Sequence, residues 1–212
     1  MSVGYWLLVI GAGLLLWLII KWLFLNPAER ADKARLDESF KKQARKRNGK
    51  VVLDRRTPAL RIPHKTLEIE LSFREDNVDL FNEYTYARFR IEGLPDKGLK
   101  ILHLDKNFLA KPIALGARLD VSDERFSEKF AITGNDTSFA NSLLTEEIRN
   151  KLMQVCPHVK FGRRTDAAPL DRERGWLTVF IPGFLIDDEV FDGLIETAVL
   201  FGDRLELLKG QG

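Results

Sequence analysis

The sequence predicts an α+β protein: an N-terminal transmembrane helix, then a two-layer domain of mainly antiparallel sheet covered by two amphipathic helices. Three observations predict this class. Residues 5–25 form one apolar run. Several later segments alternate apolar and polar side chains, as strands with one buried face do, and two segments repeat apolar residues at helical spacing. We expect a transmembrane anchor over residues 1–25, a basic juxtamembrane helix or linker over 26–50, and a cytoplasmic α+β domain over 51–212.

The apolar run has the length of a membrane span. As a helix, its residues would measure about 31 Å, close to the hydrocarbon thickness of a bilayer. Its one charged side chain stands near the end of the run, where a lysine stem reaches the headgroups. A cleaved secretory signal is disfavoured, because residues 1–4 carry no charged side chain. The membrane-flanking residues are Tyr5, Trp6, Lys21 and Trp22.

The charges around the run predict its orientation. Only the terminal amine precedes it, whereas Arg30, Lys33 and Arg35 follow it closely. The positive-inside rule then places the N-terminus outside and the C-terminal domain in the cytoplasm, at the cell inner membrane. The single cysteine, Cys156, has no partner for an intrachain disulfide, which agrees with a reducing compartment.

A helix is expected directly after the anchor. Asn26 and Pro27 suit a helix start, and Asn48 with Gly49 suits a helix end. Apolar residues recur only every fourth position between them, so we expect a mostly exposed helix.

The end of this segment is strongly basic. It holds six basic residues and no acidic one: Lys41, Lys42, Arg45, Lys46, Arg47 and Lys50. We interpret them as a topology signal that also contacts anionic lipid headgroups. Nucleic acid is not an expected partner, because no aromatic residues interleave with the basic ones.

Alternation and turn residues predict the strands, and helical spacing predicts the helices. The expected strands cover residues 67–73, 85–91, 99–104, 126–133, 158–161 and 176–181. Residues 137–155 have helical spacing, with a second start at Thr145 that predicts a short helix before a longer one. A final helix is expected from about Asp187, with an apolar stripe of Phe191, Leu194, Ile195, Ala198, Phe201 and Leu205.

The run from Phe126 to Leu152 resembles a pattern of uncharacterised bacterial membrane-anchored families. In those families a Phe-x-x-x-Phe strand leads to an Asp and then to a helix with Leu-Leu-Thr. The matching residues are Phe126, Phe130, Asp136, Leu143, Leu144 and Thr145. The resemblance covers about a third of the chain. It implies a bacterial origin and the α+β fold, and it implies no activity.

Motifs of catalysis are missing from the sequence. There is no phosphate-binding glycine loop, dinucleotide fingerprint or nucleophile elbow. Cys156 and His158 are close in sequence, but no further Cys accompanies them at metal-ligand spacing. We therefore assign no catalytic residue, metal or cofactor, although a pair of carboxylates for acid–base catalysis stays open.

One strand face is the candidate partner surface. Tyr86, Arg88 and Arg90 alternate with the apolar Ala87 and Phe89 and so share the polar face of one strand. We expect the domain to be a protein-interaction or scaffold module whose partner lies in or at the membrane. The alternatives are a domain that binds lipid or another apolar ligand, and a hydrolase-type enzyme without a recognisable motif.

Overall fold

The computed structural model describes residues 13–14, 17, 27–54, 57–75, 83–94, 98–104, 118–121, 123–162 and 175–210. Apart from residues 13, 14 and 17, the predicted anchor and its four flanking residues lie outside this set. Within it, no helix has the length and apolar character needed to cross a membrane. The anchor therefore stays a prediction.

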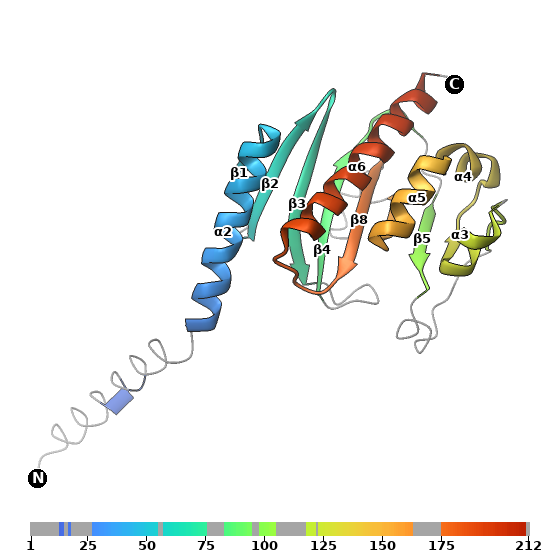
Figure 1. Cartoon of the computed structure of the whole chain (residues 1–212). Helices are drawn as coiled ribbons and strands as arrows, with labels where there is room; N and C mark the ends of the chain where they lie inside the picture. The colour runs from blue at the N-terminus through green and yellow to red at the C-terminus, as the bar shows by residue number, and fades with distance from the viewer. Residues whose placement is uncertain are drawn as a thin grey trace, which may run out of the picture.

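The described residues form eight strands and five helices (Figure 1). The strands are β1 (Lys50–Asp54), β2 (Thr57–His64), β3 (Leu67–Glu75), β4 (Glu83–Arg90), β5 (Leu99–His103), β6 (Phe130–Thr133), β7 (His158–Gly162) and β8 (Trp176–Pro182). The helices are α2 (Pro27–Arg47), α3 (Glu124–Lys129), α4 (Thr137–Leu143), α5 (Glu146–Val155) and α6 (Asp188–Lys209).

The strands make one sheet in the order β1-β2-β3-β4-β8-β7-β5-β6, and every neighbouring pair is antiparallel. Strands β1 to β4 follow each other along the chain, and β8 returns to pair with β4. The predicted antiparallel sheet is thereby confirmed. The sequence did not predict β1 and β2, which extend it at one end.

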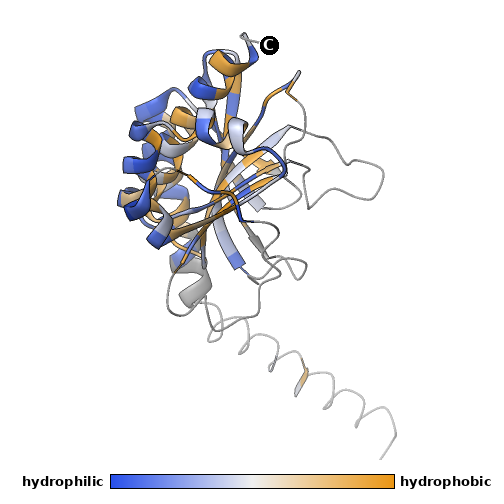
Figure 2. Ribbon diagram, turned by 90° about the vertical axis from the view of Figure 1, so that its right-hand side faces the viewer, coloured by the Kyte–Doolittle hydropathy of each residue, from blue (hydrophilic) through white to orange (hydrophobic). Residues whose placement is uncertain are grey.

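The helices lie together on one side of the sheet, which gives two layers (Figure 2). Helix α6 packs on β3, β4 and β8, α2 packs on β1 and β2, and α5 lies against α6. The long α6 comes close to the sheet at Gly202, where an added Cβ would lie 2.8 Å from Leu67 Cδ1. A residue larger than glycine at this position would require the Leu67 side chain to shift.

Because side chains alternate between the two faces of each strand, the apolar ones point toward the helices. Leu71, Ala87, Val179 and Val159 follow one another across four strands, and all are buried. The apolar stripe predicted for the last helix is fully buried against them. The hydrophobic core therefore lies between the sheet and the helix layer.

Helix α2 is mostly exposed, as expected, but one side of it belongs to this core. Leu36 and Phe40 are buried, and the Phe40 ring centre lies 5.6 Å from that of Phe191 and 5.8 Å from that of Phe73. The helix ends where Asn48 adopts positive φ, as predicted. Apolar residues at four-residue spacing were enough to bury one side of the helix.

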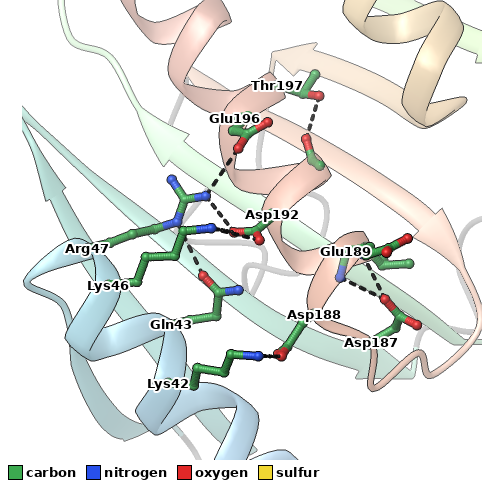
Figure 3. Close-up of polar contacts among 12 residues, drawn as sticks. Lys42, Gln43, Lys46, Arg47, Asp187, Asp188, Glu189, Asp192, Glu196 and Thr197 are labelled. Atoms are coloured by element: carbon green, nitrogen blue, oxygen red, sulfur yellow. Dashed lines mark hydrogen bonds and ion pairs between the residues drawn. The ribbon is translucent and has the colours of Figure 1, made fainter.

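Three of the six basic residues of the juxtamembrane segment form ion pairs with the last helix (Figure 3). The pairs are Lys42 with Asp188, Lys46 with Asp192, and Arg47 with both Asp192 and Glu196. The nitrogen–oxygen distances to Asp192 are 2.8 Å from Lys46 and 2.7 Å from Arg47. These ion pairs join α2 to α6, two helices that are far apart in the sequence.

The predicted strand over residues 126–133 is correct only in its second half. Residues Glu124–Lys129 form helix α3, whose first turn is capped by the Asp123 carboxylate accepting from the Phe126 N–H. The Phe126 and Phe130 rings stack with centres 4.7 Å apart. A spacing of four suits both a helix turn and strand alternation, and the Asp123 cap favours the helix.

The predicted break between a short and a longer helix is confirmed. Asp136 caps α4, and Thr145 caps α5 by accepting from the Ile148 N–H. Helix α5 ends at Cys156, which adopts the left-handed conformation with φ of 54°.

Candidate interaction face

The sheet has a second face, turned away from the five helices, which we call the far face. No helix of the described part of the chain covers it (Figure 2). Strand alternation places one row of side chains across it: Arg61, Glu70, Arg88, Thr178, Lys160 and Lys100. A neighbouring row holds Ser72, Tyr86, Phe180 and His158. The far face therefore carries charged, polar and aromatic side chains, whereas the helix side carries the apolar core residues.

A buried ion pair stands at the centre of the far face. Arg88 Nη2 lies 2.5 Å from Glu70 Oε1, and the Tyr86 hydroxyl donates to the same oxygen at 3.2 Å. Arg61 Nε approaches the other Glu70 oxygen at 3.8 Å. Glu70 and Arg88 are 9% and 5% exposed, so each compensates the other's loss of hydration.

Aromatic rings flank the guanidinium group. The Arg88 Cζ atom lies 4.8 Å from the Tyr86 ring centre and 5.2 Å from the Trp176 ring. Burial raises the pKa of Tyr86 to about 12; nearby Arg88 lowers it and the Glu70 carboxylate raises it. The phenol is therefore a neutral hydrogen-bond donor at physiological pH, in a fixed position.

A second cluster surrounds Phe180. Its ring centre lies 5.4 Å from that of Tyr84, and it stacks on the His158 ring at 5.2 Å. The His103 backbone N–H donates to His158 Nδ1 at 3.2 Å. Burial, and then the charge of His103, lowers the pKa of His158 to about 4, so its imidazole is neutral and accepts this bond.

The structure brings the predicted partner residues to one face but gives them different exposures. Tyr86 and Arg88 are buried and Arg90 is exposed. Their role as a partner surface stays a prediction. The neighbouring β7 and β8 also contribute accessible residues to the far face. The half-buried residues on these two strands include Lys160, Trp176, Thr178 and Phe180.

Those residues were missed because the sequence does not show that β8 returns beside β4. The alternation of residues 176–181 predicted a strand, but it did not indicate which strand would be its neighbour. Arg88 lies against both the Tyr86 ring and the Trp176 ring of β8, and so joins the predicted residues to that strand.

The helix side carries an open groove of about 750 Å³ between the start of α5 and the second half of α6. Three of its polar side chains have structural partners. Thr145 caps α5, Arg204 donates to the Ser142 carbonyl at 2.7 Å, and Asp203 pairs with His64 and Lys65. Glu146, Glu147 and Asn150 also line the groove, and all three are exposed.

The described residues contain no cluster of three metal-ligating side chains. Cys156 and His158, the one pair suggested by sequence spacing, have separate partners. The Cys156 thiol donates to the Met153 carbonyl and the His158 ring lies on the far face. Comparisons with protein-family models, curated proteins and solved structures find no match to this chain. The resemblance to bacterial membrane-anchored families stays a prediction.

Proposed function

We propose that this chain is a single-pass inner-membrane protein whose cytoplasmic domain binds a protein partner in or at the membrane. Residues 1–25 would anchor it with the N-terminus outside, and the far face of the sheet would bind the partner. The observation that supports the proposal is the buried Glu70–Arg88 pair, which positions aromatic side chains on a sheet face without a helix over it.

The partner's chemistry follows from the far face. Lys100, Lys160 and Arg90 lie on it beside the half-buried rings of Trp176 and Phe180. Aromatic residues and arginine are enriched in protein interfaces, and a basic surface attracts acidic partners. We infer a partner segment that combines acidic and apolar residues.

A photo-crosslinking experiment in cells tests this proposal. Benzoylphenylalanine at Phe180, on the far face, is compared with the same group at Phe184. Phe184 is 47% exposed, and its ring contacts the core residue Phe73. We expect position 180 to capture one membrane protein that position 184 does not capture. Equal capture at both positions would contradict the proposal, as would capture of nucleic acid.

A charge reversal gives a second readout. Lys160→Glu replaces a partly exposed cation of the far face, and we expect it to reduce the yield of the Phe180 cross-link. Lys209→Glu, at the end of α6, is the matched control and should leave the yield unchanged. An unchanged yield in Lys160→Glu would exclude an acidic partner segment.

A further inference from the structure

The two edge strands of the sheet, β6 and β1, differ in whether other backbone groups pair with their outer side. At the β6 edge, the Leu119 N–H donates to the Ile132 carbonyl at 2.8 Å, and Arg118 makes a backbone bridge with Thr133. At the β1 edge, none of the described residues pairs with the outer side of the strand. Edge strands normally carry a charge, a proline or a bulge that blocks pairing with another chain.

The middle of β1 has no such protection. It reads Val51, Val52 and Leu53, and no proline stands in the strand. Val51 is 41% exposed and Leu53 is 79% exposed, which is high for large aliphatic side chains. Both lie on the helix side of the sheet, because Val51 pairs with the core residue Leu60. This combination favours the addition of another strand.

The pairing with β2 shows which backbone groups point outward. Leu53 stands opposite Pro58, and a proline has no N–H to donate. That pair therefore cannot be one that exchanges two hydrogen bonds. Since such pairs alternate along an antiparallel ladder, the N–H and C=O groups of Leu53 and Val51 point to the open edge.

We propose that β1 pairs with β1 of a second copy of this chain, antiparallel and centred on Val52. In this register Val51 of each copy stands opposite Leu53 of the other, and these are the residues whose backbone groups point outward. Lys50 stands opposite Asp54, so residues of opposite charge meet at both ends of the five-residue strand. A shift by two residues would lose both charge pairs.

The helix layer is compatible with this dimer. Helix α2 packs on both β1 and β2, and neighbouring strands are about 4.8 Å apart. The two α2 helices of a dimer would therefore lie about 10 Å apart, within the usual spacing of packed helices. Val51 and Leu53 would be covered between them. The dimer uses the sheet edge and does not depend on the partner proposed for the far face.

Cysteine cross-linking of the full-length chain in detergent solution tests the register. In a Cys156→Ser background, Val52→Cys places two thiols at the centre of the dimer, where the Cα atoms would be about 4.5 Å apart. Val51→Cys is the matched control, since its own copy would be about 8–9 Å away, beyond disulfide reach. We expect roughly tenfold more oxidised dimer for position 52. Equal amounts at the two positions, or no dimer at position 52, would overturn the proposal.

A second variant needs no cross-link. Leu53→Lys changes a side chain that is 79% exposed, so the fold should be kept. It places a charge at the proposed contact between the two β1 strands. We expect the dimer dissociation constant, measured by sedimentation equilibrium, to rise at least about tenfold. Leu207→Lys, at a residue 60% exposed on α6, should leave it unchanged. An unaltered constant in Leu53→Lys would also overturn the proposal.

Discussion

Arg88 shows how one residue on the far face depends on its neighbours. Its guanidinium group is buried with the Glu70 carboxylate, 2.5 Å away. Removing one member of such a pair leaves the other charged and without hydration. We expect Arg88→Met to lower the free energy of unfolding by about 3–5 kcal/mol.

Chemical denaturation followed by tryptophan fluorescence measures this loss. Arg90→Met, at an exposed position of the same strand, is the control and should change stability by about 0.5 kcal/mol or less. The double variant Glu70→Leu with Arg88→Met should cost less than Arg88→Met alone, because no charge is left buried. A double variant less stable than the single one would contradict this account.

His158 gives the domain a pH-dependent stability. Its pKa is about 4 in the folded protein, against about 6.5 for the unfolded chain. The unfolded state binds the proton first as pH falls, so the contribution is complete above pH 6.5 and decreases toward pH 4. We expect a loss of about 2 kcal/mol between pH 7 and pH 5.

Denaturation at the two pH values checks this, with His158→Gln as the comparison. Glutamine keeps an acceptor for the His103 N–H but does not titrate, so most of the pH dependence in this window should disappear. The carboxylates of Asp192, Glu196 and Asp203 have lowered pKa values and titrate at lower pH. An equal pH dependence in the variant would exclude His158 as its origin.

At the scale of the elements, helix α2 packs as part of the domain core. A substitution at its packed side distinguishes this role from that of a linker. Phe40 is fully buried between the rings of Phe73 and Phe191. We expect Phe40→Ala to cost about 3–5 kcal/mol, the usual range for a buried phenylalanine. Measured by denaturation, a cost below about 0.5 kcal/mol would instead indicate a helix that packs loosely.

The ion pairs between α2 and α6 should stabilise α2 more than the rest of the domain. Burial raises the pKa of Asp192, but hydrogen bonds from Lys46, Arg47 and Gln43 outweigh it, so the pKa is below the usual value. The groups are partly exposed, and we expect Asp192→Asn to cost about 1 kcal/mol. Hydrogen exchange should show faster exchange in α2, with Glu38→Gln, an exposed residue of α2, as the control.

The elements also show what a sequence can predict. Apolar residues repeat regularly in both residues 67–73 and the apolar stripe of the last helix, with strand spacing in the first and helix spacing in the second. The structure confirms both elements. Strand β2 was missed because it contains Pro58 and Pro63, residues depleted in strands. The partners of the basic residues of α2 are about 146 positions away, and no local pattern indicates such a contact. The buried Glu70–Arg88 pair was missed because the sequence does not give the register between β3 and β4.

At the scale of the whole molecule, the proposed anchor and the proposed dimer together constrain orientation. Two copies in one membrane are related by a twofold axis along the membrane normal. Because the β1–β1 axis is perpendicular to the sheet, the sheet would lie parallel to the bilayer. Helix α2 would then run along the membrane surface. With the helix layer toward the lipid, the far face would be open to the cytoplasm.

The position of Lys41 tests this arrangement. Lys41 and Arg45 are exposed on α2, whereas Phe40 is buried, so the two basic residues would meet anionic headgroups, whose attraction is about 1 kcal/mol per basic residue. We expect a fluorophore at position 41 of the full-length chain, in anionic vesicles, to be quenched by headgroup quenchers. One at Thr178, on the far face, should not be. A straight helix from the anchor would instead hold position 41 about 21 Å above Pro27, out of reach of the quencher. Lack of quenching at position 41 would therefore exclude the surface orientation. The β1 cross-links test the dimer itself independently of this result.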